Sequence, residues 1–378
     1  MQRASATYVR GVCSLVACIL AMQVGCRLQN QEEQPWEHVL HVSCSPVGDL
    51  AAVITESRRP GRASLWLVAC DPLEPRSRLV AHGSEPAGPP VWRPDGGAVA
   101  VGLLAEPEGW LELVDVYEPA RTRTLRRARD TLYGWPDWSP DGKRLVWYEF
   151  NQAGEEYLTV MDMDTRAVHR LQTTRAPSSP QWNPTGRWIA FVGRDETRSG
   201  VPGAAPDVHL EINVIAPDGT RESRVPASER LRHWVWVSPQ ELLCVGRGAD
   251  RSRPTIVEVN VFTDARKDVC EEVALPGPLV GEDIRPRWDS QRQRLVLTVE
   301  LPTAQSEETS LAGAIVRFDL ADRSVRQLTG GPADSRPAWT GDGQHIVFVR
   351  EGASLWIMNA DGSGQREVIG VDDLREGP

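Results

Sequence analysis

Polar and aromatic side chains stand just ahead of several copies of a short Pro-x-Trp motif in this chain of 378 residues. They combine acids, bases and an indole ring, a mixture suited to recognising a polar ligand or a loop of a partner protein. We predict that they form one binding surface; the alternative is a set of solvated salt bridges without a binding role. The candidates are Trp135, Ser178, Arg232, His233, Glu282, Asp283, Arg285, Asp334 and Arg336.

No pattern typical of catalysis or metal binding stands out. A Gly-x-Ser-x-Gly nucleophile motif is absent, and the seven histidines have no short metal-ligand spacing. The segments 359–363 and 162–164 resemble calcium loops faintly, but neither has the glutamate expected at the twelfth position. We therefore predict no catalytic residue, no metal and no cofactor, and we interpret these acids as turn formers.

The Pro-x-Trp motif is part of a longer pattern, Trp-Ser-Pro-Asp-Gly, that recurs seven times. Its clearest copy is 138–142. The positions that align with the proline of this copy, whatever residue they hold, are 46, 94, 140, 184, 239, 290 and 341. Spacings of 44 to 55 residues suit a four-stranded propeller blade, and each copy precedes a short run of β-branched and aromatic residues. The pattern predicts an all-β, seven-bladed propeller of four-stranded antiparallel blades.

Each part of the motif has a structural reason. Proline presets φ, aspartate bonds its own backbone and glycine accepts a positive φ, so the motif predicts a tight turn between the first and second strands. The tryptophan would end the first strand and fill the wedge between neighbouring blades; an aromatic ligand cage is the alternative. Five tryptophans share this position: Trp92, Trp138, Trp182, Trp288 and Trp339.

These residues resemble the TolB-type, or WD40-like, propeller repeat family, and 355–364 follows the second half of its consensus closely. The resemblance covers roughly residues 40 to 370. TolB itself carries an α/β domain ahead of its propeller, and we expect this chain to lack one. The first blade is expected to start near Val39 and the last to end near Ile369, so we predict a ring sealed by side-chain packing, without a swapped strand. The alternative is that the segment 36–42 crosses to the last blade.

The N-terminal segment is typical of an exported protein. Arg3 and Arg10 precede an apolar stretch, 11–22, that is too short to span a bilayer. The following 23–26 resembles a bacterial lipobox, which implies a lipid on Cys26. The alternatives are ordinary cleavage or a plain membrane anchor. By family analogy, Arg27 beside this cysteine favours the outer membrane of a Gram-negative cell, with the protein facing the periplasm or the surface.

The expected organisation is therefore a signal peptide at 1–25, a lipidated cysteine and tether at 26–38, the propeller at 39–370 and a tail at 371–378. The chain has 42 basic and 52 acidic residues, an excess of acid that disfavours nucleic-acid binding. Cys44 and Cys70, like Cys244 and Cys270, are 26 residues apart. We expect no disulfide in either pair, because the blade assignment separates their strands beyond bonding distance.

The longest connections are expected on the face that also carries the links between blades. We assign them to 81–90, 127–135, 194–207, 275–285 and 301–313. Together with the polar residues near the channel mouth, they predict a lipid-anchored, non-catalytic scaffold that binds another protein at the cell envelope. Two alternatives stay open: a propeller enzyme of the carbohydrate lyase or lactonase type that works with a metal at the channel mouth, and a glycan-binding module.

Overall fold

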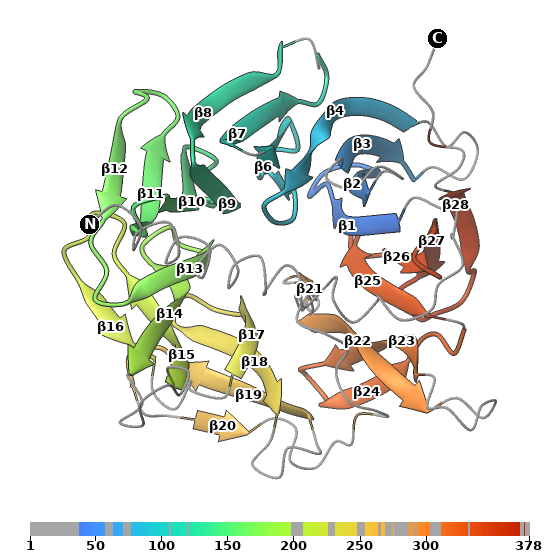
Figure 1. The fold of residues 1–378 in the computed structure, drawn as a ribbon. Coiled ribbons are helices and arrows are strands. Elements are labelled where there is room, and N and C mark those ends of the chain that lie inside the picture. The colour runs from blue at the N-terminus through green and yellow to red at the C-terminus, as the bar shows by residue number, and fades with distance from the viewer. Residues whose placement is uncertain are drawn as a thin grey trace.

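The computed structural model describes residues 38–56, 63–70, 77–105, 107–118, 121–197, 207–225, 231–247, 254–263, 266–268, 275, 287–289, 291, 293–302, 311–331, 333–370 and 374. These residues form strands β1 to β28, arranged as seven four-stranded antiparallel blades around a central axis (Figure 1). The predicted architecture is confirmed. The predicted signal peptide, Cys26 and most of the predicted C-terminal tail lie outside the described residues.

Within a blade, the chain runs from the strand nearest the axis to the strand at the rim. The first four blades consist of β1 (His38–Cys44), β2 (Leu50–Glu56), β3 (Ala63–Ala69) and β4 (Ser77–Pro86); β5 (Val91–Trp92), β6 (Ala98–Ala105), β7 (Glu108–Asp115) and β8 (Arg123–Arg129); β9 (Thr131–Trp138), β10 (Arg144–Asn151), β11 (Glu156–Asp162) and β12 (Val168–Leu171); and β13 (Ala176–Trp182), β14 (Ile189–Thr197), β15 (Asp207–Ile215) and β16 (Glu222–Arg224).

The last three blades consist of β17 (Leu231–Trp236), β18 (Glu241–Arg247), β19 (Pro254–Asn260) and β20 (Arg266–Asp268); β21 (Arg287–Asp289), β22 (Arg294–Pro302), β23 (Leu311–Asp319) and β24 (Ser324–Gln327); and β25 (Asp334–Trp339), β26 (His345–Arg350), β27 (Ser354–Asn359) and β28 (Arg366–Gly370). The end of β4 also pairs with β6, which joins the first two blades into one sheet.

Apolar cores fill the space between blades rather than within them. Seven clusters of buried side chains each combine residues of two neighbouring blades, and one of them joins blade 7 to blade 1. In β10, Leu145 and Trp147 face blade 2 whereas Val146 faces blade 4, because successive strand residues point to opposite faces. The second strands are therefore buried on both sides, which explains their unbroken apolar runs.

The motif tryptophans lie in the predicted wedges. The indole N–H groups of Trp92, Trp138 and Trp236 donate to main-chain carbonyls of the preceding blade, over 2.8 Å, 3.3 Å and 3.2 Å respectively. In the preceding blade, the acceptor is always the residue just before the position of the motif tryptophan. In blade 1 this position is held by Cys44, so the acceptor for Trp92 is Ser43. Trp236 is a sixth copy that the sequence analysis missed, since an extra residue, Val237, separates it from the Ser-Pro pair.

The aspartates of the motif are turn formers, as predicted. The hydroxyl of Ser139 donates to Asp141 over 2.5 Å, and the amide of Lys143 donates to the same carboxylate over 3.0 Å. These hydrogen bonds, that of Ser139 first, lower the pKa of Asp141. Gly142 has a φ of 68°, the conformation that the turn requires. In the segment 359–363, Asp361 accepts from the amide and the hydroxyl of Ser363 in the same way.

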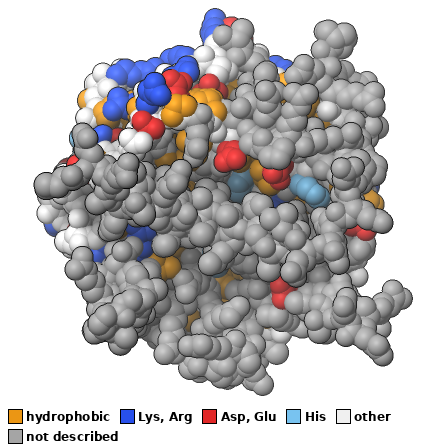
Figure 2. All heavy atoms as spheres, viewed as in Figure 1, with side chains coloured by type: hydrophobic (Ala, Val, Ile, Leu, Met, Phe, Trp, Pro, Cys, Tyr) orange, Lys and Arg blue, Asp and Glu red, His pale blue; other side chains and the backbone are white. Residues whose placement is uncertain are grey.

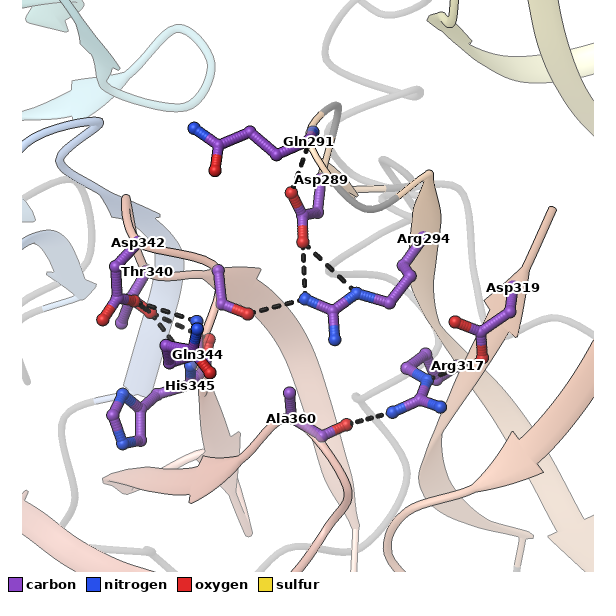
Figure 3. A network of polar contacts seen from close by, with 11 residues as sticks. Asp289, Gln291, Arg294, Arg317, Asp319, Thr340, Asp342, Gln344, His345 and Ala360 are labelled. Carbon is purple, nitrogen blue, oxygen red and sulfur yellow. Dashed lines mark hydrogen bonds and ion pairs between the residues drawn. The ribbon is translucent and has the colours of Figure 1, made fainter. Parts of the chain in front are cut away.

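Arginine clamps link adjacent turns. Arg294, in β22, contacts both Asp289 of its own blade and the turn of blade 7 that holds Asp342 (Figure 3). It donates to Asp289 Oδ2 over 2.5 Å and to the carbonyl of Gly343 over 2.6 Å, and its guanidinium lies 4.3 Å from the ring centre of Trp339. In blade 3, Arg144 repeats this arrangement toward Gly186 and Trp182 of blade 4.

The ring closes between blades 7 and 1 without a swapped strand among the described residues. β1 pairs only with β2 and β28 pairs only with β27, so each terminal blade uses its own four strands. The amide of Val39 donates to the carbonyl of Gly352 over 2.8 Å, and Arg366 Nη2 donates to the carbonyl of Cys70 over 3.1 Å. Side chains and single main-chain contacts therefore seal the ring, as predicted.

Two of the expected long connections are wrong. Residues 127–129 and 131–135 belong to β8 and β9, with only Asp130 between the strands, and most of 81–90 belongs to β4. The charged sequence of β8 resembles a loop because this strand lies at the rim, where little of it is buried. Cys44, Cys70 and Cys244 are free thiols, and burial raises the pKa of Cys70 to about 12. Cys270 lies outside the described residues.

Candidate functional site

The strands nearest the axis share a repeated irregularity. Trp135, Ser179 and Arg336 have φ values of 47°, 49° and 52°, and each stands immediately before a proline and three residues before a motif tryptophan. The pairing register shifts at each of these places, as in a β-bulge. A residue other than glycine pays about 1–2 kcal/mol for this left-handed conformation. Such strain often accompanies functional sites, which makes this ring position the leading candidate.

At Trp135, the bulge turns the backbone toward the neighbouring blade. Its amide donates to the carbonyl of Ala87 over 3.0 Å, instead of pairing with β10. The indole ring packs on Tyr148, with ring centres 5.9 Å apart, beside the buried side chain of Leu132. The bulge therefore exchanges a contact within blade 3 for one with the preceding blade, and it places an aromatic ring near the axis.

Tyr148 connects this ring to a partly buried ion pair between blades. Its hydroxyl donates to Glu156 Oε2 over 3.2 Å, and Glu156 pairs with Arg194 of blade 4. Burial, followed by the charge of Glu156, raises the pKa of Tyr148 well above its usual range. The phenol is thus neutral across physiological pH and serves as a hydrogen-bond donor, not as a base.

The structure places the other predicted site residues at or near the same repeat position. Ser178 is half-buried in β13, one residue before the bulge at Ser179. His233 is half-buried in β17, where the pairing register also shifts, and Arg232 precedes it in that strand. Glu282, Asp283 and Arg285 lie outside the described residues. Ser179, not Ser178, is the residue of blade 4 that aligns with Trp135 and Arg336.

Asp334 occupies a different environment from its neighbours. Its side chain is fully buried, and Arg350 donates to both of its oxygens, over 2.7 Å and 3.0 Å. The guanidinium of Arg350 lies 4.2 Å from the ring centre of Trp356 and also donates to Gln365. This carboxylate anchors the start of β25, two residues before the bulge at Arg336.

His41 was not selected from the sequence, yet it holds the equivalent position in blade 1, three residues before Cys44. The register of β1 also shifts next to it. Histidine and carboxylate side chains are visible near the middle of the face drawn in Figure 2. Residue types at the ring position therefore vary from blade to blade: histidine in blades 1 and 5, tryptophan in blade 3, serine in blade 4 and arginine in blade 7.

The described residues contain no cluster of three or more His, Cys, Asp or Glu side chains arranged to hold a metal ion. No helix with the length and hydropathy of a membrane span occurs in the same part of the chain. A groove of about 420 Å³ runs between the motif turns of blades 2 and 3, lined by Arg93, Pro94, Asp95, Pro140, Asp141 and Gly142. Its lining consists of residues of the two motif turns.

No protein-family model matches the chain. Among curated proteins, the Tol-Pal system protein TolB of Francisella tularensis subsp. mediasiatica is 19% identical over 266 residues, which cover 69% of this chain. That match spans only 56% of the relative's length. The crystal structure of TolB from Acinetobacter baumannii matches with a TM-score of 0.50 and 17% identity, and covers 81% of this chain and 66% of the other.

The fold is that of a TolB-like β-propeller. A structural match to oligogalacturonate lyase from Vibrio parahaemolyticus has a TM-score of 0.61 at 13% identity, and covers 86% of this chain and 91% of the lyase. Since propellers of similar shape occur in proteins with different activities, the TolB-like fold alone assigns no activity.

Proposed function

We propose that this protein is an exported, non-catalytic TolB-like scaffold that binds another protein of the cell envelope. The N-terminal sequence supports export and a lipid on Cys26, which would hold the propeller at the outer membrane of a Gram-negative cell. The similarity to TolB, named as a protein of the Tol-Pal system, supports a role in binding other envelope proteins.

The repeated bulge carries the proposal. Three blades keep a strained residue at one repeat position near the axis, and its side chain differs in each: Trp135, Ser179 and Arg336. A rigid ring that presents different side chains at equivalent positions suits a protein loop, which offers different groups to each blade. Aromatic and arginine side chains are also the residues that contribute most often to protein interfaces.

Capture from envelope membranes tests this proposal. The full-length protein with its lipid anchor serves as bait, beside a variant that carries Trp135→Ala, His233→Ala and Arg336→Ala. We expect a defined protein to be retained by the wild type and to be retained about tenfold less by the variant. Val47→Ala is the control, since Val47 is 59% exposed in the turn between β1 and β2, away from the bulges. Equal retention by both variants would show that the binding surface does not lie at this ring.

The anchor is tested separately. Cys26→Ser should release the propeller from the membrane fraction after cell lysis, because the thiol that carries the lipid is gone. The intact mass of the mature wild-type protein should show the added acyl chains. A wild-type protein without this mass increase would contradict lipidation, while leaving the binding ring untouched.

A metal-dependent enzyme is the second candidate. His41 and His233 share the ring position, and imidazole is a common metal ligand. Titration of the purified protein with Mn²⁺, followed by assays on polygalacturonate, separates the two functions. Stoichiometric Mn²⁺ binding that is lost in His41→Ala and His233→Ala, together with turnover, would favour the enzyme. A glycan-binding module would instead retain polysaccharide without cleaving it.

A further inference from the structure

The rim of blade 2 carries an unusual concentration of positive charge. Five arginines stand between positions 121 and 129, in a chain whose formal net charge is −10. All but Arg121 belong to β8, the outermost strand of the blade. Figure 2 shows Lys and Arg side chains gathered on the rim where Figure 1 places this strand. The binding ring near the axis uses none of these residues.

β8 is also an open strand edge. In the described part of the chain it pairs with β7 alone, so its outer N–H and C=O groups have no strand beside them. It is seven residues long, whereas the outermost strands of blades 3 to 7 have three to five. An open edge is a template for a further strand, and charges on it decide which strand pairs.

Two of the arginines are held by local partners. Arg127 pairs with Glu108 on β7, and its guanidinium lies 5.6 Å from the ring centre of Trp110. Arg121 pairs with Glu118 over 2.7 Å. These contacts hold one arginine ahead of β8 and one within the strand.

The remaining three arginines have no ion-pair partner among the described residues. Arg123 and Arg129 are exposed and Arg126 is half-buried. Arg126 stands opposite Leu111 on β7 and Arg129 opposite Glu108, so their side chains lie on the two faces of the sheet. Tyr117, which is 76% exposed, lies in the turn just ahead of this strand.

We propose that β8 binds an extended acidic peptide of a partner protein, which adds a fifth strand to blade 2. Main-chain hydrogen bonds along the edge would align the peptide, and its carboxylates would pair with Arg123, Arg126 and Arg129 on both faces of the sheet. Like charge on the edge would oppose pairing with a second copy of β8, so the same arginines favour an acidic strand over self-association.

The test uses a fluorescein-labelled nine-residue peptide of glutamate and valine, and follows its anisotropy as the full-length protein is added. We expect saturable binding that weakens with salt, because the arginines are exposed. The variant Arg123→Glu, Arg126→Glu and Arg129→Glu should bind at least tenfold more weakly. A matched control reverses the charge of three exposed arginines on other blades, Arg166→Glu, Arg323→Glu and Arg326→Glu, and should bind as the wild type does.

A second peptide separates strand addition from simple charge attraction. The same sequence with every backbone amide N-methylated keeps every carboxylate but has no N–H to donate along the edge, and we expect it not to bind. Equal binding of both peptides would overturn the proposal, as would equal binding by the two triple variants. If vesicles containing phosphatidylglycerol bind through the three arginines while the peptide does not, the patch is a membrane contact and the proposal fails.

Discussion

At the scale of single residues, arginine side chains connect one blade to the next. Arg144, Arg294, Arg317 and Arg366 each donate to a main-chain carbonyl in a turn or loop of the following blade, at 2.6 to 3.1 Å. A guanidinium suits this role because its planar face can stack on a tryptophan while its edge donates several hydrogen bonds. Arg294 does both, and it also neutralises the buried carboxylate of Asp289.

Replacement of Arg294 should therefore be costly. In Arg294→Ala the carboxylate of Asp289, whose side chain is 6% exposed, loses its charged partner. We expect a loss of about 3 kcal/mol in the free energy of unfolding, measured with urea. Arg294→Lys keeps the charge but not the stacked plane and should lose less. Arg121→Ala removes an exposed ion pair and should change stability by about 0.5 kcal/mol or less. A loss below about 1 kcal/mol for Arg294→Ala would contradict the clamp.

At the scale of elements, the turns and second strands could be predicted because their signals are local. Asp141 and Gly142 specify a turn by hydrogen bonds and φ values within five residues. The bulges could not be predicted, since the left-handed conformation of Trp135 depends on Ala87, in the preceding blade. The last three residues of the rim strand β8, 127–129, were predicted to belong to a connection because this strand lies at an edge, so its sequence lacks the apolar alternation of a half-buried strand.

The motif turns should make the free energy of unfolding depend on pH. The pKa of Asp141 is lowered mainly by the hydroxyl of Ser139, and those of Asp95 and Asp361 are lowered chiefly by hydrogen bonds from Arg93 and Ser363. A carboxyl with a lower pKa in the folded state contributes stability above its unfolded pKa of about 3.9, and loses it as pH falls through the folded pKa.

We therefore expect the urea midpoint to fall as the pH is lowered from about 5 to about 3. Asp141→Asn should be less stable than the wild type at neutral pH, and the difference should shrink in acid, where both side chains are uncharged. Urea titrations at four pH values measure this. Parallel curves for the two proteins would show that the turn carboxylate does not contribute to the pH dependence.

At the scale of the whole molecule, the junction of blades 7 and 1 departs from the repeat. Cys44 stands where other blades have the motif tryptophan, and Gly341 stands where blade 3 has Pro140. The thiol of Cys44 lies 3.8 Å from the carbonyl of Ala338, the same carbonyl position that the indoles reach in other blades. The glycine has a steric reason, because any Cβ at position 341 would lie 2.3 Å from the carbonyl oxygen of Pro46.

Gly341→Ala should accordingly weaken the closure of the ring. The added methyl group forces the turn of blade 7 away from Pro46, and overpacking of this kind costs about 1–3 kcal/mol. Because blades 7 and 1 are not consecutive in the chain, the strain should open their junction before the others, and hydrogen exchange should accelerate first in β1 and β25. Gly330→Ala is the matched control, since its Cβ would meet only Gln327 Nε2 at 3.5 Å. Uniform acceleration in all seven blades would instead mean that the ring unfolds as one unit. The packing between blades 7 and 1 would then be as strong as that between blades that follow one another in the chain.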